Sequence, residues 1–459
     1  MREYSTPLVV DVPATGNLTD DVVANGERYG DTVAFSRRSG STWSDVTAAT
    51  FLAEVRAVAK GLVAAGVQAG DRVALICKTR YEWTLVDYAI WFAGAVTVPV
   101  YETSSAEQIE WILSDSGARA VLAETADHVS RVSRCRERLE ELHHLWSLDG
   151  GAVDVLTRLG ADISDADLEA RRTTAGPDAL ATLIYTSGTT GRPKGCMLTH
   201  GNFMFELSVA TDELDELFAP PSDEGAGAST LLFLPLAHVF ARIIQVGCVR
   251  TRVRMGHSAD IRNLLDDFAE FQPTFILAVP RVFEKVFNTA SQHAAADGRG
   301  KIFGRATDVA ISYSRGLETG RTALAIRAQH RIFDRLVYGR LRAALGGRCE
   351  YAVSGGAPLG ERLGHFYRGI GVNVLEGYGL TETTAALTAN LPAAQKVGSV
   401  GRPLQGTSVR VAEDGELLFQ GGQVFAGYWH LDAATAEAKE ADGWFHTGDV
   451  GEVDDEGFV

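Results

Sequence analysis

One loop of the chain concentrates residue types that bind phosphate groups. The segment Tyr185-Thr-Ser-Gly-Thr-Thr-Gly-Arg-Pro-Lys-Gly195 contains four Ser or Thr hydroxyls, three glycines and one lysine, and it follows the predicted strand Thr182 to Tyr185. Glycines let backbone N–H groups approach phosphate oxygens, hydroxyls add donors, and Lys194 supplies a cation. It is not a Walker A loop, because Lys194 lies three residues after Gly191 and no Ser or Thr follows it. We therefore expect a phosphate-binding loop, with a flexible surface loop as the alternative.

Four further segments combine small residues with side chains suited to a nucleotide. In chain order they are Leu234-Pro-Leu-Ala-His-Val-Phe-Ala-Arg242, Ser354-Gly-Gly-Ala-Pro358, Glu376-Gly-Tyr-Gly-Leu-Thr-Glu-Thr383 and His446-Thr-Gly-Asp-Val-Gly451. Gly355, Gly356 and Ala357 have little side-chain bulk, so a flat adenine could lie against their backbone. Tyr378 could stack on the same ring, or it is a buried aromatic of the core.

Each polar side chain of these segments could bind a ligand or could have only a structural role. Glu382 is a hard oxygen ligand of the kind that Mg²⁺ takes, or it is a capping or solvated carboxylate. Thr381 could donate to an α-phosphate. Asp449 could accept both hydroxyls of a ribose, or it is an aspartate of a turn. His238 follows Pro235 at the end of a predicted strand, and a hydrogen-bonded core histidine is the alternative there.

In this order, the five motifs resemble the signatures of the adenylate-forming enzymes, which include acyl-CoA synthetases, firefly luciferase and peptide-synthetase adenylation domains. The resemblance spans roughly residues 20 to 459. The nucleotide contacts that it implies are Thr186, Ser187, Gly188, Thr189, Thr190, Gly191, Lys194, Gly355, Gly356, Ala357, Glu376, Gly377, Tyr378, Gly379, Thr381 and Asp449. The residues that it implies for catalysis are Lys194, His238, Thr381 and Glu382. Glu382 would also hold Mg²⁺, and His238 would orient the acyl carboxylate or shape the substrate tunnel.

Two weaker signals narrow the resemblance. Val279-Pro-Arg-Val-Phe-Glu-Lys-Val-Phe-Asn288 and the Arg-rich stretch Gly300 to Leu345 are similar to segments of long-chain fatty-acid–CoA ligases of the mycobacterial FadD type. The implied reaction joins a fatty carboxylate to the α-phosphate of Mg·ATP, releases pyrophosphate, and then passes the acyl group to the thiol of coenzyme A. Fatty acid, ATP and coenzyme A are therefore the expected ligands. The alternatives are a fatty acyl-AMP ligase that loads a carrier protein, and a nucleotide-binding module without chemistry. Acyl chain length and oligomeric state are left open.

Positioning these motifs requires strands that alternate with helices. The expected strands of the first half are Val33 to Phe35, Val73 to Cys77, Ala95 to Val100 and Ala120 to Ala123. Helices are expected at Thr47 to Ala65, Glu82 to Phe92 and Ala106 to Leu113, the last with a capping box of Ser104 and Glu107. The later strands are expected at Leu231 to Leu234, Phe275 to Val279, Tyr351 to Val353 and Val372 to Leu375. Such βαβ units predict a mainly parallel sheet with helices on both faces and ligands at the carboxyl ends of the strands.

The predicted fold is therefore α/β. Residues 1–384 are expected to form two layered βαβ-type subdomains that carry the ATP and acyl sites, and 385–459 a small β-barrel lobe of short strands and Gly-rich turns. The Arg-rich stretch is expected to be helical, with apolar positions at Ile302, Ala306, Val309, Ile332, Leu336 and Leu341. The resemblance implies an acyl-CoA synthetase-like large N-terminal domain. It also implies that a mobile C-terminal domain is missing after residue 459. The chain is therefore expected to bind ATP and acyl-adenylate but to turn over poorly.

Composition excludes several classes of function. The 459 residues include 43 Lys or Arg and 59 Asp or Glu, a net charge of −16, so the basic footprint of a duplex-DNA binder is missing and no nucleic acid is expected. The cysteines are Cys77, Cys135, Cys196, Cys248 and Cys349, scattered and without a Cys-x-x-Cys pair. They indicate free thiols in the cytoplasm and no metal site built on cysteine. No apolar run reaches the roughly 20 residues of a membrane helix. Amphipathic helices between Gly300 and Leu345 leave contact with the inner face of a membrane open.

Overall fold

The computed structural model of the protein describes residues 3–40, 42–186, 191–222 and 225–459. Its first layered unit is built on a sheet with seven strands. They are β4 (Arg72–Ile76), β5 (Val96–Val100), β6 (Ala120–Ala123), β7 (His144–Ser147), β8 (Leu180–Thr186), β9 (Lys194–Thr199) and β19 (Gly427–Tyr428). Their order is β19-β9-β8-β5-β4-β6-β7. β4 to β8 run parallel, whereas β9 and β19 run antiparallel to their neighbours.

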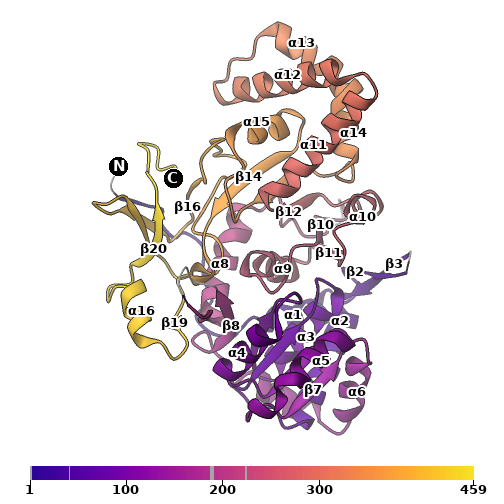
Figure 1. Ribbon diagram of the computed structural model, residues 1–459, viewed down its shortest axis with the longest axis vertical. Helices are drawn as coiled ribbons and strands as arrows, with labels where there is room; N and C mark the ends of the chain where they lie inside the picture. Colours follow the sequence, from indigo (N-terminus) through magenta and orange to yellow (C-terminus); the bar gives the residue numbers. More distant parts are fainter. Residues whose placement is uncertain (1–2, 41, 187–190, 223–224) are drawn as a thin grey trace.

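Helices cover both faces of this sheet (Figure 1). One face packs against α2 (Ala48–Ala64), α3 (Tyr81–Phe92), α6 (Ala152–Leu159) and α7 (Asp165–Arg172), the other against α4 (Ala106–Ser116) and α5 (Ala126–Cys135). Val73 and Leu75 of β4 belong to the first core and Ala74 and Ile76 to the second. Burial on both faces explains why these strands are continuously apolar.

The second layered unit is built on a sheet with nine strands. They are β2 (Val33–Ser39), β3 (Thr42–Thr47), β10 (Ser229–Leu232), β11 (Arg254–His257), β12 (Phe275–Ala278), β13 (Tyr351–Ser354), β14 (Asn373–Tyr378), β15 (Thr388–Ala389) and β16 (Arg402–Pro403). Their order is β16-β15-β14-β13-β12-β10-β11-β2-β3. Neighbours from β14 to β2 are parallel, and antiparallel pairs extend the sheet at both edges. The parallel α/β fold that the sequence predicts is therefore confirmed.

The main apolar core lies between the two sheets. It joins Leu75 of β4 to Leu277 of β12 through side chains of α3, α8 (His200–Glu213) and α9 (Val239–Thr251). Within it, Arg242 of α9 forms an ion pair with Asp87 of α3, and both side chains are 0% exposed. The Arg242 guanidinium also donates to the Thr182 hydroxyl of β8 at 2.6 Å. The helix that follows His238 is thereby tied to the strand that precedes the predicted phosphate loop.

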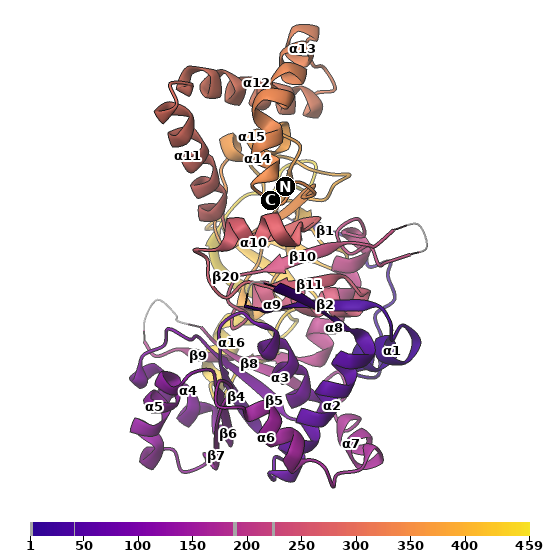
Figure 2. The same cartoon turned by 90° about the vertical axis from the view of Figure 1, so that its right-hand side faces the viewer.

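Helices project from the outer face of the nine-stranded sheet as a hood, which Figure 2 shows at the top of the molecule. They are α10 (Leu264–Phe271), α11 (Pro280–Ala296), α12 (Gly300–Glu318), α13 (Leu324–Phe333), the π-helical turn η2 (Asp334–Tyr338), α14 (Gly339–Ala343) and α15 (Glu361–Gly369). Of the apolar positions expected here, Ala306, Val309 and Leu341 are buried. Ile302 of α12, Ile332 of α13 and Leu336 of η2 are 50%, 58% and 59% exposed.

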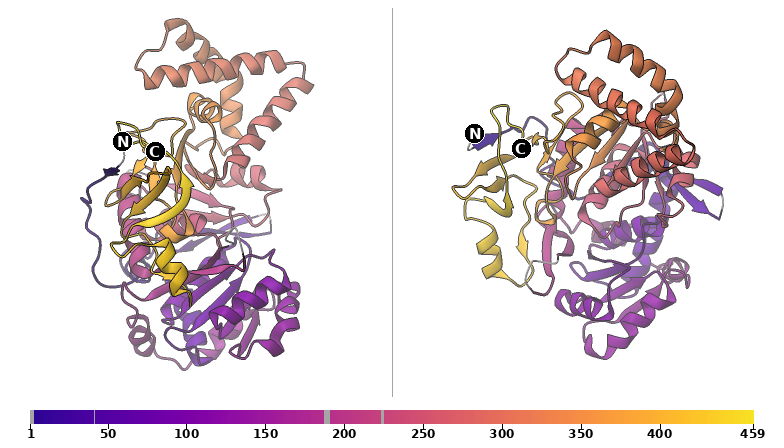
Figure 3. Two further views of the ribbon diagram at one scale, coloured as in Figure 1. Left: turned by 60° about the vertical axis from the view of Figure 1, so that its left-hand side comes forward. Right: turned by 45° about the horizontal axis from the view of Figure 1, so that its top comes forward.

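The last part of the chain builds a small antiparallel sheet. Its strands are β1 (Glu3–Ser5), β17 (Ser408–Val411), β18 (Glu416–Gln420) and β20 (Phe445–Val450), in the order β1-β17-β18-β20. β1 therefore lies beside segments from the other end of the chain (Figure 3). The helix α16 (Asp432–Ala438) connects β19 to β20. None of the described helices combines the length and the apolar character that crossing a membrane requires.

One local expectation changes. The helix α4 is capped by Ser105, not Ser104: the Ser105 hydroxyl accepts from the Gln108 amide at 3.3 Å, and the Gln108 side chain accepts from the Ser105 amide at 2.9 Å. The capping residue must lie three positions before its partner, and Gln108 fills that place one residue later than Glu107. The expected helix at Thr47 to Ala65 is confirmed, with Thr47 as its cap. The remaining short helices are α1 (Asp20–Arg28), η1 (Arg136–Arg138) and η3 (Thr381–Thr383).

Candidate active site

The predicted phosphate loop joins β8 to β9 as a hairpin. Thr186 and Lys194 lie opposite each other in the antiparallel register, so they close the base of the loop. Gly191 has φ of +120°, a conformation that glycine adopts without strain. Ser187, Gly188, Thr189 and Thr190, which were predicted to contact the triphosphate, lie outside the described residues. The described part of the loop thus presents one hydroxyl and one ammonium at the carboxyl end of β8.

Tyr428 joins Lys194 to Glu382. The Lys194 ammonium lies 4.8 Å from the centroid of the Tyr428 ring, and the Tyr428 hydroxyl donates to Glu382 Oε1 at 2.9 Å. β19 places the tyrosine, because Tyr428 pairs with Cys196 of β9. Burial and the nearby Glu382 charge raise the pKa of the Tyr428 phenol, so it remains a donor. Lys194 and Glu382, two predicted residues far apart in sequence, are therefore brought together by one tyrosine that sequence reasoning missed.

Cys196 lies beneath this cluster. Its Sγ is 3.6 Å from the Thr186 hydroxyl, and its side chain is buried. Burial, and next the charge of Glu382, raise the pKa of this thiol well above its usual range. A buried, neutral thiol is a poor nucleophile, so the structure indicates a packing role for Cys196 next to Thr186.

The glycine loop after β13 lies between α9 and β14. A Cβ on Gly355 would be 3.1 Å from the Phe240 ring and 3.5 Å from the Gly377 carbonyl, so the backbone here approaches its neighbours closely. Glu376 is buried, and its carboxylate accepts from the Leu359 amide at 2.8 Å. Burial raises the pKa of Glu376. This side chain thus fastens the end of the glycine loop to β14, while Gly356 and Ala357 remain exposed beside it.

Tyr378 and Asp449 meet at the other side of that loop. The Tyr378 hydroxyl donates to Asp449 Oδ2 at 2.6 Å, and its ring lies against Phe419 with centroids 5.9 Å apart. Gly379 has no room for a side chain, because a Cβ would overlap the carbonyl oxygen of Ala385. The residues predicted for the adenine and for the ribose are therefore brought together from β14 and β20.

A polar network holds Asp449 in place. The Asp449 amide donates to the Thr447 hydroxyl at 3.1 Å, and the Gly448 amide donates to Glu416 at 2.9 Å. His446 bridges Glu416 and Glu440 at 2.9 Å and 3.1 Å. The hydrogen bond that His446 donates to Glu416 is the largest cause of its raised pKa. The turn that carries Asp449 is thus fixed on both sides, while the Asp449 carboxylate itself stays exposed.

His238 caps α9. Its Nδ1 accepts from the Phe240 amide at 3.2 Å, so Nε2 carries the proton in the neutral ring. Protein packed around the imidazole lowers its pKa, which favours that neutral form. Because Phe240 also contacts the Gly355 backbone, the end of α9 adjoins the glycine loop. An N–H donor and a helix N-terminus are both suited to a carboxylate.

The carboxylates of the site set limits on a divalent cation. Glu382 is a single carboxylate, with one oxygen already bonded to Tyr428, and no group of three or more His, Cys, Asp or Glu that could hold a metal occurs in the described part of the chain. Mg²⁺ commonly binds one or two carboxylates, with waters and substrate phosphates completing its shell. The residues therefore fit Mg²⁺ as a companion of bound phosphates and do not form a self-contained metal cage.

A family described as AMP-binding enzyme matches residues 22–429, which include four of the five motifs. The chain belongs to the AMP-binding enzymes.

Curated relatives of this AMP-binding enzyme carry more specific names. It is 48% identical to the long-chain-fatty-acid–CoA ligase FadD15 of Mycobacterium bovis over 462 residues, covering 100% of this chain and 76% of the relative. The protein of the same name from Mycobacterium tuberculosis is 47% identical with the same coverage. The peroxisomal long chain acyl-CoA synthetase 7 of Arabidopsis thaliana is 30% identical over 96% of this chain and 65% of the relative.

Solved structures share the architecture of this AMP-binding enzyme. The inhibitor-bound N-terminal domain of FACL13 from Mycobacterium tuberculosis superposes with a TM-score of 0.73 at 25% identity, covering 96% of this chain and 98% of that domain. The long-chain-fatty-acid-CoA ligase FadD1 of Archaeoglobus fulgidus has a TM-score of 0.76 at 19% identity, covering 99% and 85%. The latter likeness concerns the fold alone. The expected α/β fold and the predicted superfamily are both confirmed.

Proposed function

We propose that this AMP-binding enzyme activates a long-chain fatty acid with ATP and transfers the acyl group to coenzyme A. In the first half, a carboxylate oxygen attacks the α-phosphorus, the bond to the β-phosphate breaks, and pyrophosphate leaves. In the second half, the thiol attacks the acyl carbonyl and AMP leaves. The match of the whole chain to 76% of the length of two long-chain-fatty-acid–CoA ligases supports the substrate class. The observation that carries the proposal is the cluster in which Tyr428 contacts both Lys194 and Glu382.

The roles of the residues follow from charge and hydrogen bonding. Lys194 and Thr186 would contact the triphosphate, where a cation and a hydroxyl neutralise the charge that develops on leaving pyrophosphate. His238 would donate from Nε2 to the acyl carboxylate and orient it for attack. Thr381, at the start of η3, would donate to the α-phosphate.

The nucleoside would be held by the second group of residues. Gly355, Gly356 and Ala357 would border the adenine, Tyr378 would stack on it, and Asp449 would accept from the ribose hydroxyls. Gly188 with Ser187, Thr189 and Thr190 would complete the triphosphate contacts. Mg²⁺, when bound, neutralises phosphate charge, and Glu382 is the residue that would hold it.

We also propose that the hood contacts the surface of an anionic membrane. Eleven Lys or Arg and three Asp or Glu lie between residues 299 and 348, in a chain whose net charge is −16. Leu324 and Ile332 of α13 are 82% and 58% exposed. Basic helices with exposed apolar side chains are attracted to anionic lipids and bury those side chains at the interface.

The adenylation step is tested by exchange of labelled pyrophosphate into ATP. We expect exchange only when a fatty acid is added, with palmitate more effective than acetate, and we expect Lys194→Ala to reduce it by at least tenfold. Arg321→Ala, which removes an exposed hood cation, is the matched control and keeps the rate. Exchange that needs no fatty acid, or that favours acetate, would count against the proposed substrate class.

A further inference from the structure

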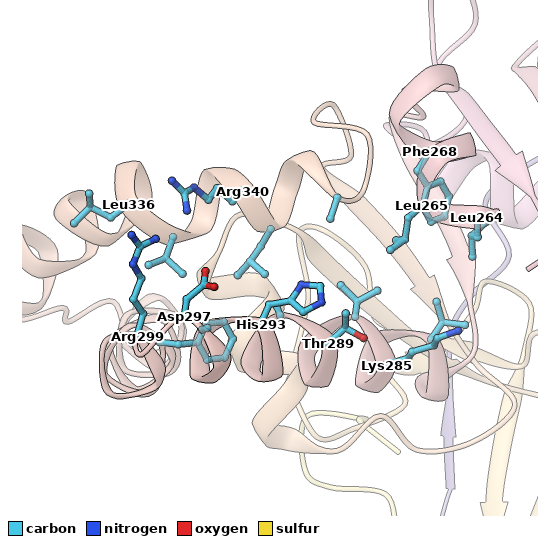
Figure 4. Close-up of a pocket in the computed structure, with 18 of the residues that line it drawn as sticks. Leu264, Leu265, Phe268, Lys285, Thr289, His293, Asp297, Arg299, Leu336 and Arg340 are labelled. Atoms are coloured by element: carbon cyan, nitrogen blue, oxygen red, sulfur yellow. The ribbon is translucent and has the colours of Figure 1, made fainter. Parts of the chain in front are cut away.

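A groove of about 700 Å³ lies in the hood, lined by none of the residues assigned to the nucleotide (Figure 4). It runs between α11 on one side and η2 with α14 on the other, and α10 closes one end. Most of its lining is apolar, from Leu264, Phe268, Val286, Phe303, Leu336 and Leu341. A cavity of this size with an apolar lining is typical of a site for a small lipid-like molecule.

The amphipathic helix α11 gives the groove its length. Phe283 and Phe287 turn inward, where they pack edge-to-face on Tyr367 and Phe366 of α15. The opposite side of the helix lines the groove from Val282 to Asp297. At 1.5 Å per residue that span is about 22 Å, which suits one extended chain better than a compact ring.

Large apolar side chains of the groove are left in water. Leu265, Ile302 and Leu336 line it and are 46%, 50% and 59% exposed. Covering such side chains is favourable in proportion to the apolar area removed from water. An aliphatic chain would cover them along the whole groove.

The polar groups of the groove favour an anion. Lys285, Arg299 and Arg340 line it, and among the residues that the structure describes none of the three forms an ion pair. Figure 4 shows Arg299 and Arg340 near one end and Lys285 near the other. Asp297 and His293 also line the groove, so the cations still outnumber the carboxylate in a chain that is acidic overall. A carboxylate head would find a cation at either end.

We propose that this groove binds one long-chain fatty acid as its carboxylate, as a second site beside the one where the acid is activated. The choice of a fatty acid rests on the proposed function, whereas the preference for an anionic aliphatic chain rests on the groove itself. The groove would hold a fatty acid at the hood before it is activated.

Equilibrium dialysis of labelled palmitate against the full chain tests this, with the nucleotide site filled by a hydrolysis-resistant palmitoyl-adenylate analogue. We expect one equivalent of palmitate to bind in addition to the analogue, with affinity rising up to about fourfold per methylene of the acid. Leu336→Glu, which adds a carboxylate to the groove, should weaken binding at least tenfold. Leu324→Glu makes the same change at an exposed site outside the lining and should leave it unchanged.

A second pair of variants separates charge from packing. Arg340→Glu should weaken palmitate at least fivefold, and Arg321→Glu, outside the lining, should not. The proposal is overturned if no palmitate binds beside the analogue, or if the Leu336 and Leu324 variants lose palmitate affinity equally. It is also overturned if the protein binds anionic vesicles but does not bind palmitate. If the analogue itself does not bind, the proposed function fails, and the comparison of the variants with palmitate alone still decides the groove.

Discussion

Tyr428 contacts two oppositely charged side chains: its ring centroid lies 4.8 Å from the Lys194 ammonium, and its hydroxyl donates to Glu382 at 2.9 Å. The ring makes a cation–π contact and the hydroxyl a charge-assisted hydrogen bond. Tyr428 thus holds the Lys194 ammonium of the phosphate loop and the Glu382 carboxylate, the proposed metal ligand, at a fixed separation. This geometry predicts that Tyr428 positions both without touching substrate itself.

Tyr428→Phe separates these two roles. It keeps the cation–π contact and removes the hydrogen bond to Glu382, which as a bond to a charged group is worth about 1.5–3 kcal/mol. We expect the dissociation constant of Mg·ATP to rise roughly tenfold, while ATP without Mg²⁺ changes by less than about threefold. Isothermal titration measures both values. Equal losses with and without Mg²⁺ would show that the hydroxyl does not act through Glu382.

Gly379→Ala tests the closest backbone approach in the site. A Cβ at Gly379 would overlap the Ala385 carbonyl oxygen, so the segment that carries Thr381 and Glu382 must move. We expect nucleotide binding to weaken by at least tenfold. Gly304→Ala is the control, since Gly304 lies in α12 with open space around it, and alanine there should raise stability by up to about 1 kcal/mol. Wild-type nucleotide affinity in Gly379→Ala would contradict the packing described.

The ion pair between Arg242 and Asp87 predicts a large effect on stability. Both side chains are fully buried, so removing one partner leaves an uncompensated charge. Arg242→Met should lower the free energy of unfolding by about 3–5 kcal/mol in urea titrations. The double variant Arg242→Met with Asp87→Leu should lose less than that single variant. A double variant as unstable as the sum of the two single ones would contradict this coupling.

Glu206 predicts how stability depends on pH. It is buried on α8, where Oε1 accepts from the Ala386 amide at 3.3 Å, and Oε2 finds no hydrogen bond within the described structure. Burial raises the pKa of this carboxyl well above the 4.5 that is usual for a glutamate, so the folded chain holds a proton that the unfolded chain has released. The stabilisation is complete below about pH 4.5 and falls as pH rises through the folded pKa.

The neutral isostere removes that dependence. Glu206→Gln should melt at a higher temperature than the wild type at pH 8 and at the same temperature near pH 4.5, as measured by calorimetry. Glu140→Gln, at an exposed position, serves as the control and should leave the melting curve unchanged at both values. A wild-type advantage at pH 8 would mean that Glu206 is ionised in the folded state.

Sequence reasoning captured the parts of the fold that local pattern determines. The strand Ala120 to Ala123 was predicted with its observed bounds, because four apolar residues stand between polar neighbours. The capping residue of α4 was placed one position early, since Ser104 and Ser105 both precede a residue that can return the hydrogen bond. Exposure of Ile302 and Leu336 could not be read from periodicity, because an apolar stripe does not reveal whether another element covers it.

The sequence also predicted some residues of the candidate site and missed others. Residue type and motif order singled out Lys194, Glu382, Tyr378 and Asp449. The structure places Lys194 and Glu382 in one cluster around Tyr428, and Tyr378 with Asp449 in another. Tyr428 was missed because it lies in a strand of two residues whose pairing with β9 is tertiary. The nucleotide contact expected of Glu376 stays a prediction. The structure shows its carboxylate accepting from the Leu359 amide, a contact that no local pattern indicates.

The most direct test of the account is the affinity for an acyl-adenylate. Isothermal titration should compare a hydrolysis-resistant palmitoyl-adenylate analogue with AMP and with an acetyl-adenylate analogue. Because one site is proposed to hold the nucleotide and the long chain together, the palmitoyl analogue should bind at least about 100-fold more tightly than either. Asp449→Ala should weaken the palmitoyl analogue by about tenfold or more. A palmitoyl analogue that binds no more tightly than AMP would contradict the central claim.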